Sequence, residues 1–304
     1  MKKNALIALS MIMLSVFSMT FTACGNDDDD DDAPVIVTPK YAEDAALYKI
    51  SGKSDITSIE FTESGMYIIT KANDSSKAKV CGKFVKSKTI NSLTRGDSDE
   101  DNEYIHGKYT KNGDVYTLEG FGTITVEKEG DVNVSLKVQQ TGKEAYTLSA
   151  QPVKKFKDSD ITNKLCRTWK FEKGRLVVNK VNKGDSVVLD KTSPKISVLL
   201  TSLDSVWNEF YPHKYSDYEE ITFTKSGSYI IKYTDNTIAV AQWKWKDEKK
   251  GTMYYSWENW ADEEGYEEEP LEISFNDNDD LVIDKKEDNA RYTEKFTYYH
   301  SKTK

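Results

Sequence analysis

Hydrophobic and polar residues alternate along most of the chain in short runs that end in turn-forming residues. In one such run, Ile59 and Phe61 are separated by a polar residue, and Ser64 and Gly65 form a turn before the apolar residues 67–69. A period of two is typical of a β-strand with one buried face, and glycine permits the backbone angles of a tight turn. The pattern predicts an antiparallel, all-β protein.

The same pattern returns 162 residues later. Residues 59–69 read IEFTESGMYII, residues 221–231 read ITFTKSGSYII, and eight of these eleven positions are identical. A weaker correspondence continues beyond them, with residues 106–109 opposite residues 242–245. Each half therefore carries its own series of roughly eight short strands with turn signals about every ten residues, a spacing that predicts a barrel or a sandwich.

We expect two antiparallel, eight-stranded barrel-like domains, one in residues 45–155 and one in residues 160–304. Closing a sheet into a barrel leaves no exposed edge strand. One short helix is predicted in the second domain, from Ser197 to Phe210, where it would cover one mouth of the barrel. Its apolar residues recur at helical spacing and are Val198, Leu199, Leu203, Val206 and Phe210.

The beginning of the chain reads as an export signal. Met1-Lys2-Lys3 is followed by a mainly apolar run over residues 5–21, and small residues lead to Cys24. The run is shorter and more polar than a membrane-spanning helix, which favours a signal peptide in residues 1–23. Residues 24–44 include six consecutive aspartates, whose mutual repulsion predicts a flexible acidic tether.

Residues 22–25, Thr-Ala-Cys-Gly, resemble the lipobox of bacterial lipoproteins, although Phe21 replaces the usual leucine. The resemblance implies that Cys24 is acylated and anchors the protein in a membrane through its lipid. The acidic run after Cys24 resembles the lipoprotein export signal of the Bacteroides group, which implies the outer face of the outer membrane. The alternative is that the run is only a tether.

The second half carries a further resemblance. Leu165, Thr168 and Trp169, with the later segments FTKSGSYI and QWKW, resemble lipocalin-like (calycin-like) domains of Bacteroides lipoproteins, although Arg167 stands where that family has glycine. The resemblance covers residues 164–304 directly and residues 45–152 through the repeat. It implies a barrel framework and names no ligand.

Composition and motifs exclude several functions. The net charge is −9, and no basic stripe is present, so nucleic acid is not an expected partner. No GxSxG, HExxH or paired cysteine motif occurs, and we therefore predict no enzyme, no catalytic residue and no cofactor. Asp97, Asp99 and Asp101 are spaced like calcium ligands, but Asn102 and Lys108 break that motif, so no metal site is predicted.

All six tryptophans lie between Trp169 and Trp260. They either fill the second barrel or line an aromatic cup. On the second interpretation the protein is a non-catalytic binding module for a small apolar or glycan ligand. On the first it is a structural or accessory subunit of an outer-membrane protein complex, with filled barrels. The candidate ligand-binding residues are Trp243, Trp245, Tyr255, Trp257 and Trp260.

Cys81 and Cys166 fall in different halves of the chain. The exported location allows a disulfide that would join the two domains, and the alternative is two separate buried thiols.

Overall fold

The computed structural model describes residues 41–72, 102–129, 132–181, 186–207, 216–256, 270–288 and 291–303. All of them belong to one compact unit, which spans residues 36–304. The predicted lipidation site Cys24, the aspartates at 97–101, Cys81, Trp257 and Trp260 lie outside the described residues. Of the described helices, none is both long and apolar enough to cross a membrane.

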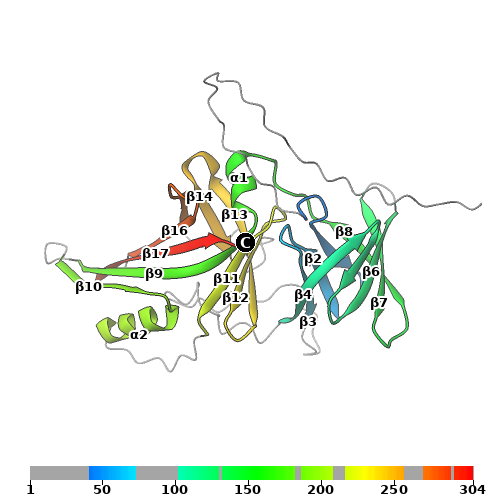
Figure 1. Cartoon of the computed structure of the whole chain (residues 1–304), viewed down its shortest axis with the longest axis horizontal. Helices are drawn as coiled ribbons and strands as arrows, with labels where there is room; N and C mark the ends of the chain where they lie inside the picture. Colours follow the sequence, from blue (N-terminus) through cyan, green and yellow to red (C-terminus); the bar gives the residue numbers. More distant parts are fainter. Residues whose placement is uncertain are drawn as a thin grey trace, which may run out of the picture. The chain divides into compact units, whose positions relative to one another are not determined.

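The first barrel consists of eight antiparallel strands in chain order (Figure 1). Each strand pairs with the next, and β1 closes the barrel against β8 with Tyr48 opposite Pro152. The strands are β1 (Ala46–Ser51), β2 (Ile56–Phe61), β3 (Met66–Ala72), β4 (Asn102–Asn112), β5 (Val115–Leu118), β6 (Gly122–Glu129), β7 (Asn133–Gln140) and β8 (Tyr146–Pro152).

The second barrel closes through β9, which pairs with β11 at its beginning and with β17 along its length. A further strand, β10, pairs with the later part of β9. Its elements are α1 (Asp160–Leu165), β9 (Thr168–Lys180), β10 (Ser186–Ser193), α2 (Ile196–Trp207), β11 (Tyr218–Phe223), β12 (Ser228–Tyr233), β13 (Ile238–Asp247), the 3-10 helix η1 (Glu248–Lys250), β14 (Thr252–Ser256), β15 (Leu271–Phe275), β16 (Leu281–Asp288) and β17 (Tyr292–Lys302). The predicted all-β fold of two eight-stranded barrels is confirmed.

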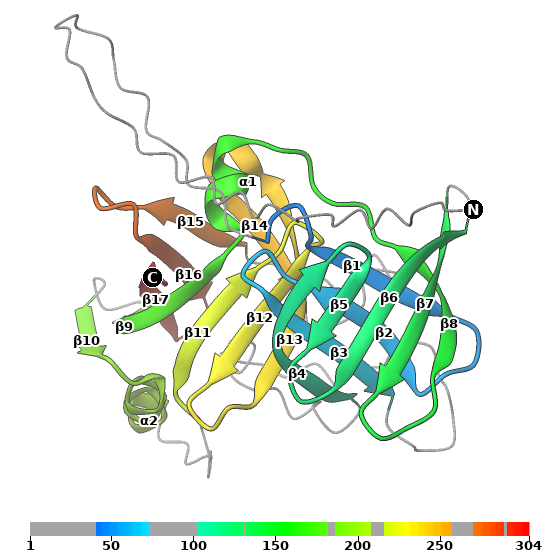
Figure 2. The same cartoon turned by 45° about the vertical axis from the view of Figure 1, so that its right-hand side comes forward.

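Helix α2 lies beside β10, as Figure 2 shows, and its apolar side packs on the core of the second barrel. The core residues on this side are Ile196, Leu199, Leu200 and Leu203. A Cβ atom at Gly174 of β9 would stand 2.8 Å from Leu199, so glycine makes room for the helix. The predicted helix is therefore confirmed as α2, and Phe210, the last residue of the prediction, lies outside the described residues.

Helix α1 and strand β10 were not expected from the sequence. Helix α1 begins after Ser159, whose side chain accepts a hydrogen bond from the N–H of Thr162, as an N-cap residue does. The residue that follows the helix, Cys166, is a buried free thiol.

The repeated hairpins have matching turns in the two barrels. The N–H of Tyr109 donates to the carbonyl of Gly65 (2.9 Å), and the N–H of Trp243 donates to the carbonyl of Gly227 (2.8 Å). The side chains match as well, because the hydroxyl of Tyr109 donates to Thr62 (3.0 Å) and the indole of Trp243 donates to Thr224 (3.1 Å). Tyr109 therefore corresponds to Trp243, which corrects the weaker part of the sequence alignment by two residues.

Candidate functional site

The predicted ligand residues Trp243 and Tyr255 lie opposite each other on β13 and β14. Both side chains are buried in the core of the second barrel, with exposed fractions of 1% and 0%. Trp243 packs edge-on against Phe156 (4.7 Å between ring centroids) and Trp245 (5.3 Å). A ligand could contact these two rings only from inside the barrel, and their predicted role stays a prediction.

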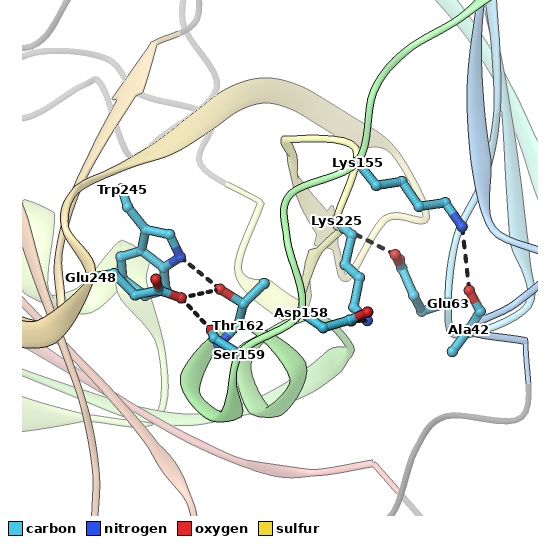
Figure 3. Close-up of polar contacts among 9 residues, drawn as sticks. All are labelled: Ala42, Glu63, Lys155, Asp158, Ser159, Thr162, Lys225, Trp245 and Glu248. Atoms are coloured by element: carbon cyan, nitrogen blue, oxygen red, sulfur yellow. Dashed lines mark hydrogen bonds and ion pairs between the residues drawn. The ribbon is translucent and has the colours of Figure 1, made fainter.

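Trp245, the third predicted residue that the structure describes, belongs to a polar network around α1 (Figure 3). Its indole N–H donates to the hydroxyl of Thr162 (2.8 Å), which donates to Glu248 (2.7 Å). Ser159 also donates to Glu248, and these two hydroxyls hold the pKa of the Glu248 carboxyl below its usual range. The network fastens α1 to the segment that links β13 and β14, which is a structural role for the Trp245 indole.

A different part of the second barrel has a charged interior. Strand β16 alternates so that Lys285 shares the buried face with Leu281 and Ile283, and Lys285 is only 2% exposed. Its ammonium forms an ion pair with Glu287 (2.5 Å) and lies 5.7 Å from the centre of the Tyr255 ring. Burial lowers the pKa of Lys285, but Tyr255 and Glu287 outweigh it and raise the pKa above the usual value. The barrel therefore encloses a positive charge.

Five buried tyrosines lie near one another in the core of the second barrel, and we call them the tyrosine cluster; its member Tyr255 contacts Lys285. Ring centroids are 6.2 Å apart for Tyr229 and Tyr255 and 6.4 Å apart for Tyr218 and Tyr298. Burial raises the pKa of Tyr218 and Tyr298 well above the usual value, so their hydroxyls stay protonated and can donate. The members are Tyr218, Tyr229, Tyr233, Tyr255 and Tyr298.

Two buried polar atoms near the cluster have no hydrogen-bond partner among the described residues. They are the hydroxyl of Tyr218 and Nδ1 of His300. Both rings pack on Phe171, with centroid distances of 5.7 Å for Tyr218 and 5.5 Å for His300. Burial lowers the pKa of His300 to about 3, so the imidazole is neutral. Because a buried polar group without a partner is costly, such atoms indicate where a water or a ligand bonds.

Lys285 and the tyrosine cluster were not predicted from the sequence. The signal was present, because the alternation in β16 places Lys285 on the face of Leu281 and Ile283. The interior thus combines one ammonium, paired with Glu287, with tyrosine hydroxyls among aromatic rings.

Comparisons with known proteins add little. The chain matches no protein family and no curated protein. One solved structure, a protein of unknown function from the DUF3598 family of Nostoc punctiforme, is 7% identical, with 85% of this chain and 94% of that chain covered at a TM-score of 0.17. A likeness this low carries no argument about function.

Proposed function

We propose that this protein is a non-catalytic binding module whose second barrel encloses a small apolar or glycan ligand. The observation that carries the proposal is the buried hydroxyl of Tyr218, which finds no partner among the described residues of a barrel interior that also holds Lys285. An eight-stranded barrel is wide enough either for packed side chains or for one small ligand. A ligand oxygen that accepts from Tyr218 would remove the cost of the unmade hydrogen bond.

The ligand that fits this interior has an oxygen-bearing head group and a body that packs on aromatic rings. The head group would accept hydrogen bonds from Tyr218 and from the ammonium of Lys285. Aromatic faces suit both an apolar chain and the apolar face of a sugar ring. This chemistry keeps both ligand classes predicted from the sequence.

Intrinsic tryptophan fluorescence tests the proposal, because all six tryptophans lie in the second half of the chain. The protein would be titrated with fatty acids, bile acids and oligosaccharides. We expect a saturable change for one class and, for Tyr218→Phe, an affinity about tenfold lower. The matched control is Tyr109→Phe in the first barrel, which should bind like the wild type. Absence of a saturable change with every class would contradict the proposal.

The proposal includes a lipid anchor on Cys24 and a position on the outer face of the outer membrane. It rests on the likeness of residues 22–25 to a lipobox and of the acidic run to an export signal. Labelling of cells with a fatty-acid analogue should tag the wild type and leave Cys24→Ser untagged. Protease added to intact cells should remove the wild-type protein. A wild type without label would contradict the anchor, and resistance to protease would contradict the exposed position.

The second candidate function is a structural or accessory subunit of an outer-membrane complex. The complete burial of Trp243 and Tyr255 favours it, because these rings already fill part of the barrel. Cross-linking on intact cells would then give a discrete product with an outer-membrane protein, and the fluorescence titrations would show no response.

A further inference from the structure

The repeated hairpins of the two barrels contact each other. Ile68 of β3 and Ile230 of β12 occupy equivalent positions in the repeat, and both belong to one buried apolar cluster with Ile238. Met66 and Tyr104 of the first barrel pack on the same cluster. Equivalent residues that meet in this way are typical of an interface with two-fold symmetry.

Polar contacts join the same two hairpins. A carboxylate oxygen of Glu63 accepts a hydrogen bond from the N–H of Lys225 (2.9 Å), as Figure 3 shows. Glu60 accepts from the hydroxyl of Thr224 (2.8 Å), and it is also bonded by Ser228. Glu60 and Glu63 are 3% and 1% exposed, so these carboxyl groups are buried between the barrels.

The two repeats differ at only three of their eleven positions, and at each of them at least one of the two residues takes part in the contact between the barrels. They are Glu60, Glu63 and Met66 in the first repeat, against Thr222, Lys225 and Ser228 in the second. Residue 63 meets its own equivalent, residue 225, so one faces the other across the contact. Residue 60 meets residue 228. The identical positions form the hairpin itself, and the three differing positions determine which hairpin it contacts.

The opposite charges of Glu63 and Lys225 favour contact between the two different hairpins over contact between two identical ones. Two copies of the first hairpin face to face would bury Glu63 against a second Glu63, and two copies of the second would oppose two Lys225 residues. Like charges held together away from water are strongly unfavourable. In the chain, burial raises the pKa of the Glu63 carboxyl, and the nearby charges of Lys155 and Lys225 partly offset that increase. Lys225 is itself held by Asp158 (2.5 Å).

We propose that the two barrels form an internal heterodimer through the repeated hairpins, and that residues 60/222, 63/225 and 66/228 select the other barrel of the same chain over a second copy of the same barrel. The interface is therefore a specificity surface whose partner is the second half of the chain.

Charge reversal at the central pair tests the proposal in the full chain. The variants are Glu63→Lys, Lys225→Glu and the double exchange. Hydrogen exchange of the Thr168 amide reports the contact, because that N–H donates to Ser64 of the other barrel (2.8 Å). The amides of Tyr109 and Trp243 report each barrel separately, because their bonds stay inside one barrel. The control is Lys137→Glu at an exposed position of β7.

Each single variant should reduce protection of the Thr168 amide at least about tenfold and leave the Tyr109 and Trp243 amides unchanged. The double exchange should restore protection, because the two-fold relation lets the carboxylate introduced at position 225 accept from the N–H of residue 63. The control should change none of the three. Unchanged Thr168 protection in both single variants, or a double exchange no better than the single variants, would overturn the proposal. Where a single variant does not fold, recovery of folding in the double exchange supports the proposal and its failure contradicts it.

Discussion

The two barrels share one framework but differ in how their buried tyrosines are satisfied. In the first barrel the hydroxyls of Tyr67, Tyr109 and Tyr116 donate to the backbone carbonyls of Glu119, Thr62 and Asp44, at 2.8, 3.0 and 3.0 Å. In the second barrel Tyr255 of the tyrosine cluster contacts the buried ammonium of Lys285, and the Tyr218 hydroxyl has no partner among the residues described.

This difference distinguishes polar groups that stabilise the fold from polar groups that could contact a ligand. Where each hydroxyl is bonded to the barrel's own backbone, the polar groups stabilise the fold and offer nothing to a ligand. In the second barrel, a tyrosine hydroxyl without a partner in the described chain would still be able to donate a hydrogen bond to a ligand. The first barrel is the internal control against which the second can be tested.

The largest expected effect compares two lysine–carboxylate pairs. Lys285→Met keeps most of the side chain's length but removes a buried ammonium together with its ion pair to Glu287. We expect a loss of about 3–5 kcal/mol in the free energy of unfolding. Lys111→Met in the first barrel breaks an ion pair with Asp44 that is partly exposed, and should cost less than about 1 kcal/mol. Urea unfolding measures both, and equal losses would remove the distinction between the two interiors.

The next effect concerns pH and the contact between the barrels. Burial raises the pKa of Glu60 from 4.5 to about 7. Between pH 4.5 and 7 the folded state therefore keeps a proton that the unfolded chain releases. The free energy of unfolding falls by about 3 kcal/mol from this group as the pH rises through this window, and the contribution is constant above it. The charged groups around it are Glu63 and, beyond Glu63, Lys155 and Lys225.

Urea midpoints at pH 5 and pH 8 check this prediction. Glu60→Gln stays neutral at both values and should lose most of the difference. Glu127→Gln, at an exposed position of β6, should keep it. A Glu60→Gln variant with the full wild-type difference would show that other groups cause the pH dependence.

The smallest expected effect comes from removing one buried tyrosine hydroxyl in each barrel and comparing the changes in stability. Tyr109→Phe removes a buried hydrogen bond to the carbonyl of Thr62, which keeps its bond from the N–H of Gly65, so it should cost about 1 kcal/mol of stability. Tyr218→Phe removes a hydroxyl without a partner in the described chain and should be neutral or slightly stabilising in the absence of ligand. Thermal unfolding of the two variants measures this, and an equal loss in Tyr218→Phe would mean that its hydroxyl is already bonded.

The alternation and the repeat were enough to predict the two barrels, and the apolar spacing was enough to predict α2. They could not predict that Glu60 and Thr222 are buried, because alternation shows which residues share a face and not what covers the opposite face. The six residues of α1 are too few for a helical period to be visible. Trp243 was matched two residues out of register because the segments that lead from β3 to β4 and from β12 to β13 differ in length.

The spacing of the tryptophans in the sequence was not enough to predict which residues form the site. Trp243 and Trp245 stand out in the sequence, yet the structure uses both indoles in hydrogen bonds within the barrel's own framework. Lys285 does not stand out, since charged residues are common in this chain. Its inward position follows only from the alternation in β16, which places it on the buried face with Leu281 and Ile283.

The most direct test of ligand binding in the second barrel is a titration followed by NMR of tyrosine-labelled protein. The ligand class that changes tryptophan fluorescence would be added stepwise. We predict saturable shifts for Tyr218, Tyr229, Tyr255 and Tyr298, with Tyr67, Tyr109 and Tyr116 of the first barrel unchanged. Shifts confined to the first barrel, or no shift in either set, would contradict it.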